Sequence, residues 1–239
     1  MASLVPTHEM SVSRPVQRVK GSTAIAEIKT EPLRPTDWRA GLPHLMNDDV
    51  TLRELRRSDA AALQRIARCP DVARHTWPAP HDVKAFERFI EWARTERAAG
   101  RYVCFGIVPD GATDASGLFE LRQMQPGFFR GELGCIMDPT LWGTGLFQAA
   151  ARLMLEFAFG IVGVHRIEAR TSVDNVRSNM AMSRLGARKE GLLRAAFVSD
   201  GRHVDQHLWA IVSGLDECVG SSPWRPSSGP APVLNHEGV

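Results

Sequence analysis

The alternation of apolar and polar residues along the chain predicts one mixed α/β domain. Short runs that are apolar throughout or at every second position are typical of strands, whereas apolar residues three to four positions apart are typical of helices. This pattern predicts strands at 50–55, 102–108, 118–124, 131–137, 165–173, 192–198 and 204–212. With the helical patterns between them the order is β-α-α-β-β-β-α-β-α-β-β, a mixed α/β fold of the α+β type with a largely antiparallel start.

Capping residues mark the ends of the expected helices. Ser58, Asp82 and Asn175 each precede a helical pattern and have side chains that accept hydrogen bonds from the backbone N–H groups of a first turn. Gly100 and Gly186 end two of these helices, because glycine adopts the left-handed conformation that follows many helices. The apolar face of the helix that begins at Asp82 consists of Val83, Phe86, Phe89, Ile90 and Ala93.

The two ends of the chain differ from the middle in composition. Residues 1–46 contain Pro, Ser, Thr and mixed charges with little periodicity, and we interpret them as a partly irregular N-terminal extension. Residues 214–239 are rich in Pro, Ser and Gly and are expected to form an irregular C-terminal tail. The folded domain is therefore expected to span residues 47–213.

Composition and charge argue against several classes of function. The hydrophobic content of 44% is sufficient for a buried core. The net charge is only +2 and no block of Lys or Arg occurs, so a nucleic-acid partner is not expected. No apolar run approaches the roughly 18 residues that span a bilayer. The first residues also lack the apolar stretch of a secretory signal, so we expect a cytoplasmic protein without a membrane partner.

The spacing of cysteines and histidines predicts no metal site. Cys69, Cys104, Cys135 and Cys218 include no Cys-x-x-Cys pair, and the eight histidines are scattered. We expect free thiols in a reducing compartment, no metal ion, and no cysteine that acts as a nucleophile.

Two glycines, Gly143 and Gly145, directly precede the long apolar helix expected at 146–159. A helix that starts in this way presents unpaired backbone N–H groups and the positive end of its dipole, and glycines let an anion approach the backbone. Turns of this kind also occur purely for packing, and this alternative stays open. The pattern matches neither the P-loop, which continues with Gly-Lys-Ser/Thr, nor the dinucleotide fingerprint, which needs a third glycine.

Four motifs surround this turn: Glu132-Leu133-Gly134, Pro139 to Gly145, Asn175 to Ser178, and Arg184-Leu185-Gly186. Together they resemble the GNAT N-acetyltransferase superfamily, and within it the Rim-type branch of ribosomal-protein N-terminal acetyltransferases. The resemblance covers about residues 48 to 213. It implies a mostly antiparallel central sheet with a splay between its central strands and helices on its flanks. It also implies direct transfer of an acetyl group from acetyl-CoA to a primary amine, either a protein N-terminus or a small-molecule amine.

The resemblance assigns cofactor contacts to the turn, the strand before it and the helices after it. The turn holds the pyrophosphate of acetyl-CoA, the strand binds the pantetheine arm, and the Asn-x-x-Ser segment lies near the sulfur. The residues at these positions are Ile136, Met137, Trp142, Gly143, Thr144, Gly145, Phe147, Gln148, Asn175 and Ser178. Phe147 departs from the family, which has a small residue there, and its ring either crowds the pyrophosphate or points into the core.

Acetyl transfer requires a neutral amine, because an ammonium ion has no lone pair. By resemblance Glu132 is the expected catalytic base and Glu120 is the alternative, while a purely solvated or ion-paired role for Glu132 stays equally open. Ser178 is expected to donate a hydrogen bond to the sulfur or to relay a proton, unless it serves only the start of its helix. The single tyrosine, Tyr102, lies on an earlier strand and is not expected to be the proton donor.

Two other functions stay open. One is a non-catalytic acyl-CoA-binding or sensor module on the same fold, in which Phe147 alters the cofactor pocket. The other is a structural or partner-binding protein that does not bind CoA. The acceptor amine and the formation of a homodimer are also left open. We interpret His165, Asp205 and the pair His203 and His207 as structural residues, with the lining of a substrate mouth as the alternative role of the two histidines.

Overall fold

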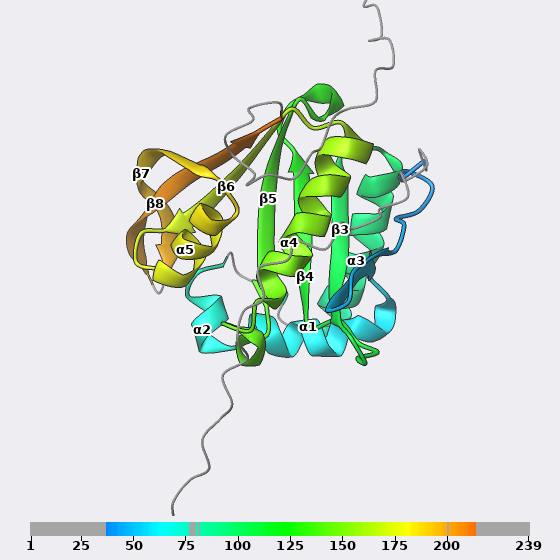
Figure 1. The fold of residues 1–239 in the computed structure, drawn as a ribbon. Helices are drawn as coiled ribbons and strands as arrows, with labels where there is room; N and C mark the ends of the chain where they lie inside the picture. The colour runs from blue at the N-terminus through cyan, green and yellow to red at the C-terminus, as the bar shows by residue number, and fades with distance from the viewer. Residues whose placement is uncertain (1–36, 77–79, 81, 200, 214–239) are drawn as a thin grey trace, which may run out of the picture. The chain divides into compact units, whose positions relative to one another are not determined.

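The computed structural model describes residues 37–76, 80, 82–199 and 201–213 (Figure 1). The chain divides into the units Met1–Leu33 and Arg34–Val239, and all described residues belong to the second. In this part, one eight-stranded sheet has the order β1-β2-β3-β4-β5-β6-β8-β7. Its strands are β1 (Leu45–Met46), β2 (Val50–Glu54), β3 (Tyr102–Pro109), β4 (Gly117–Gln123), β5 (Arg130–Met137), β6 (Arg166–Ser172), β7 (Arg188–Ser199) and β8 (Arg202–Val212). The predicted mixed fold is confirmed.

The centre of the sheet contains its one parallel pair among the described strands, β5 with β6. These strands pair only over residues 130–132 and 166–168. Farther along, β5 continues to Met137 beside β4, while β6 continues to Ser172 beside β8. The two strands therefore diverge, and the predicted splay is confirmed (Figure 1).

Helices cover both faces of the sheet (Figure 1). They are α1 (Ala60–Ala67), α2 (Pro70–Ala73), α3 (Val83–Ala98), α4 (Leu146–Phe157) and α5 (Val176–Arg184). On one face, Phe157 of α4 lies edge-to-face against Phe105 of β3, with ring centroids 5.0 Å apart. On the other face, Leu63 of α1 and Ile90 of α3 share a second core with Cys104 of β3. None of the helices in the described residues is both long and apolar enough to cross a bilayer.

The helix starts agree with the sequence at two positions and differ at one. Asp82 accepts a hydrogen bond from the amide of Ala85 at 2.7 Å, so it caps α3 as predicted. The prediction for Ser58 is wrong, because Ser58 is exposed inside a short 3₁₀ turn, η1 (Arg57–Asp59). The buried carboxylate of Asp59 holds this turn instead: Oδ2 accepts the amide of Arg56, three residues earlier, at 2.7 Å, and gives α1 no side-chain cap. Prediction from pattern also erred at Val83, which is 38% exposed and lies off the apolar face of α3.

The same Asp59 carboxylate forms a buried ion pair with Arg53 of β2. The guanidinium donates to both carboxylate oxygens, at 2.8 and 2.9 Å, and both side chains are almost completely buried. Charges removed from water in this way require a well-oriented partner, and the two-point geometry supplies it. The pair fixes the connection from the sheet into α1.

Residues 37–46, the last part of the expected extension, pack onto the domain. Trp38 is buried and meets Phe128 edge-to-face at 5.9 Å between ring centroids. Arg97 of α3 donates to the carbonyl of Trp38 at 3.2 Å, and β1 pairs with β2. Residues 1–36 and the expected tail 214–239 lie outside the described residues.

Two elements differ in length from the sequence pattern. α4 ends at Phe157, and the chain continues as a π-helical turn, η4 (Ala158–Val162). β7 begins at Arg188 instead of 192 and has an irregular register between Leu193 and Phe197. α2 was not predicted, because four residues are too few to show a helical period.

Candidate functional site

The turn between β5 and α4 is open on one side. It consists of a 3₁₀ segment, η3 (Pro139–Leu141), followed by residues 142–145. Gly143 and Gly145 have φ of +80° and +95°, the left-handed conformation that residues with a side chain rarely adopt. A Cβ at either position would have no neighbouring atom within 4 Å. The glycines therefore meet a backbone requirement and leave the space above the turn free.

This turn presents unpaired hydrogen-bond donors. Among the described residues, the amide N–H groups of Gly143, Gly145 and Phe147 have no hydrogen-bond partner. They lie at the N-terminus of the twelve-residue helix α4, where the dipole is positive. The arrangement fits phosphate oxygens, which backbone amides at a helix start bind well.

Trp142 braces the turn and connects it to α5. Its indole Nε1 donates to the carbonyl of Met137 at 3.2 Å, which ties the turn to the end of β5. The guanidinium of Arg177 lies over the indole ring, 4.2 Å from its centroid. Arg177 thus brings a positive charge next to the turn. The sequence prediction missed it, although it lies inside the quoted segment Asn175 to Ser178.

Phe147 and Gln148 both face the interior of the domain. The Phe147 ring contacts the buried Phe119 of β4 at 5.6 Å between centroids and packs against the core. The amide Nε2 of Gln148 donates to the carbonyl of Ala181 at 3.0 Å and so links α4 to α5. Of the two directions considered for the ring at 147, the structure has the one that points into the core.

The splay leaves a free strand edge. Residues 133–137 of β5 pair with β4 on one side and have no strand partner on the β6 side within the described chain. Ile136 and Met137 lie on this edge, next to the turn. Unpaired backbone groups of an exposed strand edge accept another extended chain as a partner.

The start of α5 is fixed as predicted. Asn175 Oδ1 accepts the amide of Ser178 at 3.0 Å, and this bond caps the helix. The cap therefore uses the backbone of Ser178 and leaves its side chain free: the Ser178 hydroxyl has no hydrogen-bond partner in the described part of the chain.

Glu132 lies within a set of charged side chains on adjacent strands. It sits opposite Arg122 of β4 and forms an ion pair with it, and its Oε1 lies 3.4 Å from Nε of Arg170 of β6. The hydrogen bond to Glu132 raises the pKa of Arg122. Both carboxylate oxygens of Glu132 therefore have a cationic partner.

Glu120 lies deeper in the same face of the sheet. Its Oε2 accepts a hydrogen bond from the hydroxyl of Tyr102 on β3. Burial raises the pKa of Glu120, and the hydrogen bond from Tyr102 only partly opposes this effect. Burial also raises the pKa of Tyr102, so this hydroxyl keeps its proton and donates a hydrogen bond to the carboxylate.

Gly134, opposite Glu120 on β5, makes room for this carboxylate. A Cβ at Gly134 would lie 2.6 Å from Glu120 Oε1, 2.9 Å from its Cγ and 3.1 Å from its Cδ. The Glu-Leu-Gly motif of the sequence thus has a steric role on this strand, which only the pairing register reveals.

The cysteines of the described region are free thiols: Cys69, Cys104 and Cys135. Burial raises the pKa of the Cys104 and Cys135 thiols, so both stay protonated. A buried thiol that stays protonated is a poor nucleophile. Cys218 lies outside the described residues.

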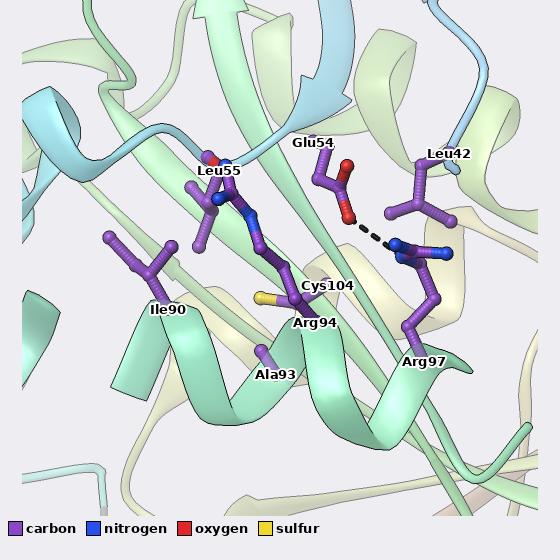
Figure 2. A pocket seen from close by; sticks show the side chains of 8 residues that line it. All are labelled: Leu42, Glu54, Leu55, Ile90, Ala93, Arg94, Arg97 and Cys104. Atoms are coloured by element: carbon purple, nitrogen blue, oxygen red, sulfur yellow. Dashed lines mark hydrogen bonds and ion pairs between the residues drawn. The ribbon is translucent and has the colours of Figure 1, made fainter. Parts of the chain in front are cut away.

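A small cavity between β2 and α3 is separate from this site (Figure 2). Its volume is about 10 Å³, enough for a single water molecule. The ion pair of Glu54 and Arg97, at 2.7 Å, lies along its wall, and Cys104 lies at its base (Figure 2). An acyl chain or an amine substrate does not fit there.

The remaining polar residues singled out in the sequence have packing partners. His165 stacks on Phe129 at 4.9 Å between ring centroids, and Asp205 Oδ1 accepts the amide of Ala195 at 2.8 Å. His207 Nδ1 lies 2.8 Å from Asn179 Oδ1. These contacts agree with structural roles, and His203 is exposed.

Comparison with known proteins gives a family. The sequence matches the acetyltransferase (GNAT) domain over residues 49–188, more than half of the chain. The uncharacterized N-acetyltransferase p20 of Bacillus licheniformis is 24% identical over 169 residues, covering 70% of this chain and 95% of the relative. A spermidine N(1)-acetyltransferase of Vibrio cholerae is 24% identical over 163 residues, covering 67% and 91%.

Solved structures agree with this assignment. Mycobacterium smegmatis RimJ in complex with CoA-disulfide has a TM-score of 0.63 and 28% identity, over 69% of this chain and 82% of RimJ. The ribosomal-protein-S5-alanine acetyltransferase of Vibrio fischeri has a TM-score of 0.66 over 72% and 97%, and its 17% identity shows the fold alone. The resemblance to the Rim-type branch is confirmed. The family match over residues 49–188, the splayed sheet and the glycine turn together show that this chain belongs to the GNAT family of N-acetyltransferases and is an acyltransferase.

Proposed function

We propose that this chain transfers the acetyl group of acetyl-CoA directly to a primary amine. The observation that carries the proposal is the open turn at the start of α4, where three amide groups lack partners among the described residues. These donors fit the oxygens of a diphosphate, and Arg177 adds a cation beside them. Phe147 supports the proposal, since its contact with Phe119 leaves the turn clear.

The free edge of β5 and the start of α5 complete the proposed binding site. Residues 133–137 offer backbone N–H and C=O groups to the amides of a pantetheine arm. Acetyl-CoA, when bound, supplies an acyl thioester whose C–S bond breaks as the amine nitrogen forms the new C–N bond. The Ser178 hydroxyl donates a hydrogen bond to the departing sulfur, and Asn175 holds Ser178 in place.

Of the two candidate bases, the geometry favours Glu120 over Glu132. An amine that approaches Glu132 has to displace Arg122 or Arg170 from its carboxylate. Among the described residues Glu120 forms no ion pair, although the charge of Arg122 acts on it, and its raised pKa makes it a better match for a proton released near neutral pH. We assign Glu120 as the group that accepts the proton of the amine. Glu132 instead positions the side chains of Arg122 and Arg170. The protonated thiols of Cys104 and Cys135 support direct transfer without a thiol intermediate.

Binding is tested by calorimetric titration of acetyl-CoA into the full chain and two variants. Gly145→Ala places a side chain at a left-handed position in the proposed phosphate site, and Gly111→Ala does so in the β3–β4 turn, where the added Cβ also has no neighbour. Gly145→Ala should weaken binding at least about tenfold, while Gly111→Ala should leave it unchanged. Equal effects of the two variants, or no binding by the parent chain, would refute the cofactor site.

Turnover is tested by thiol release from acetyl-CoA with a panel of amines. The panel contains peptides with N-terminal Ala or Ser and small amines, so it separates the two acceptor classes. Glu120→Gln should lower kcat by about 100-fold or more, the range of general-base catalysis, with acetyl-CoA affinity retained. Glu132→Gln is the matched variant on the next strand and should act mainly through KM. Binding of acetyl-CoA without turnover on any amine would instead identify a non-catalytic module.

A further inference from the structure

Two buried polar atoms near the turn between β6 and α5 lack a partner. Among the described residues, neither Nδ1 of His75 nor Oγ of Ser172 makes a hydrogen bond. Ser172 is only 2% exposed. A buried polar atom without a partner costs free energy, so native proteins contain few of them, and each requires an explanation.

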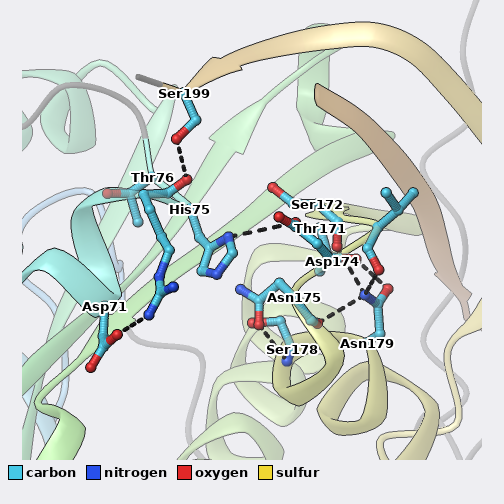
Figure 3. Close-up of polar contacts among 12 residues, drawn as sticks. Asp71, His75, Thr76, Thr171, Ser172, Asp174, Asn175, Ser178, Asn179 and Ser199 are labelled. Carbon is cyan, nitrogen blue, oxygen red and sulfur yellow. Dashed lines mark hydrogen bonds and ion pairs between the residues drawn. The ribbon is translucent and has the colours of Figure 1, made fainter. Parts of the chain in front are cut away.

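A carboxylate accompanies these two atoms. Asp174 Oδ1 lies 3.9 Å from His75 Nδ1, which is too far for a hydrogen bond. Asp174 follows Ser172 by two residues, and Figure 3 shows the His75 ring directed toward this segment. The gap between the imidazole nitrogen and the carboxylate oxygen is wide enough for one small donor group to contact both.

The surrounding structure holds the two sides of the gap in place. The amide of His75 donates to the carbonyl of Val72 at 3.0 Å, and Ser199 Oγ of β7 donates to the carbonyl of Arg74 at 2.8 Å. On the other side, Asn179 Nδ2 of α5 donates to the carbonyl of Ser172 at 2.9 Å (Figure 3). Side chains on such fixed backbone are suited to binding a ligand without rearrangement.

The side chains of His75, Ser172 and Asp174 can each accept a hydrogen bond near neutral pH. Burial lowers the pKa of His75; the charge of Arg74 adds to this shift and that of Asp174 opposes it. The shift favours the neutral ring, which has one nitrogen lone pair. The Ser172 hydroxyl also accepts, and Asp174 supplies a negative charge. An ammonium group has three N–H donors and one positive charge, which matches this set.

We propose that His75, Ser172 and Asp174 form a subsite for a second, non-reacting ammonium group of a diamine acceptor. This inference rests on the proposed function. The group held here is not the one acetylated, because a carboxylate stabilises the charged form and the attacking amine has to be neutral. Asp174 directly precedes Asn175, which holds Ser178 in the proposed acetyl-CoA site, so part of the subsite and the Ser178 hydroxyl lie on the same short segment before and within the start of α5.

A binding experiment on the full chain tests the subsite without turnover. The probe is 1,4-diaminobutane, and the control is 4-amino-1-butanol, in which a hydroxyl group replaces one ammonium. Diaminobutane should shift the NMR signals of the His75 ring, identified by their loss in His75→Gln, and the amino alcohol should shift them much less. Asp174→Asn should weaken diaminobutane binding at least about tenfold, while the distant Asp110→Asn should leave it unchanged.

Ser172→Ala separates a ligand-binding role from a structural one. If the hydroxyl serves a ligand, its removal should leave the urea midpoint unchanged or raised, because a buried unpaired group is lost, and should weaken diaminobutane binding. A lowered midpoint with unchanged binding would overturn the role of Ser172.

The outcomes distinguish this inference from the proposed function. Unchanged His75 signals with diaminobutane, or full binding by Asp174→Asn, would overturn the subsite. Acetylation of amines with the same KM for diaminobutane in the parent chain, Asp174→Asn and Ser172→Ala would overturn it while the proposed function stands. Diaminobutane binding at His75 without acetylation of any amine would support the subsite and refute the proposed function.

Discussion

Replacing Gly134 by alanine tests how tightly the Glu120 carboxylate is held. The new Cβ would lie 2.6 Å from Oε1, 2.9 Å from Cγ and 3.1 Å from Cδ of Glu120. Contacts this short force one of the partners to move. Glu120 is half-buried and accepts a hydrogen bond from Tyr102, so its movement breaks that bond or strains the strands.

The size of the effect follows from these two routes. Overpacking a filled interior costs about 1–3 kcal/mol. Loss of a hydrogen bond to a charged group costs about 1.5–3 kcal/mol. The protein is expected to adopt whichever of the two changes, overpacking or loss of the hydrogen bond, costs less free energy. Alanine in a strand regains about 0.5–1 kcal/mol relative to glycine. Gly134→Ala alone should therefore lower the free energy of unfolding by about 0.5–2 kcal/mol.

A double-mutant cycle isolates the contact. Glu120→Ala removes all three atoms that the new Cβ would meet, so Gly134→Ala should be harmless in that background. Urea unfolding followed by tryptophan fluorescence measures the four proteins, and the coupling free energy should be about 1–3 kcal/mol. Gly191→Ala in β7 is the control, because its Cβ would meet nothing within 4 Å. A coupling below about 0.5 kcal/mol would show that Glu120 moves freely and would refute the reasoning.

Three further predictions concern other parts of the domain. Phe147→Ala should lower the free energy of unfolding, measured in urea, by about 2–3 kcal/mol, because the ring packs on the core. The affinity for acetyl-CoA, measured by calorimetry, should change by less than about threefold. Much tighter binding by the variant would place the ring in the phosphate site. Asp59→Asn should lower the free energy of unfolding, measured by thermal unfolding, by about 3–5 kcal/mol, because Arg53 loses its buried carboxylate. Ser58→Ala should leave this free energy nearly unchanged, and a small effect of Asp59→Asn would contradict the role of the ion pair. Glu120 binds its proton more tightly in the folded state than in the unfolded state, where its pKa is 4.5. As pH rises above 4.5, the parent chain should therefore lose stability relative to Glu120→Gln in urea titrations. A difference in the free energy of unfolding that stays constant with pH would argue against the raised pKa.

The sequence located the functional turn because its signal is local. Two glycines before a long apolar helix demand left-handed backbone at those positions, and the structure has it at Gly143 and Gly145. The helix caps at Asp82 and Asn175 could also be predicted from the sequence, since an N-cap depends on residues within three positions. Ser58 failed for the opposite reason: Asp59, one residue later, has a partner on β2 that local pattern cannot show.

Side-chain contacts between strands could not be predicted from the pattern of apolar and polar residues. The alternation in 165–173 places Arg166, Glu168 and Arg170 on one face, but the pairing of Arg170 with Glu132 depends on the register of two strands joined through α4. The same holds for the clearance that Gly134 gives Glu120, and for His75, which a loop brings to Asp174 from a distant part of the sequence.

The sequence by itself determined the mixed α/β order of elements, the glycine turn and the family, because each depends on short-range periodicity or on motifs in a given order. Only the tertiary structure decided which carboxylate accepts a hydrogen bond from Tyr102, which one is paired with arginines, and which way Phe147 points. The physical reason is that burial and charge pairing arise from side chains far apart in the chain, whose meeting depends on strand register and on the packing of helices over the sheet.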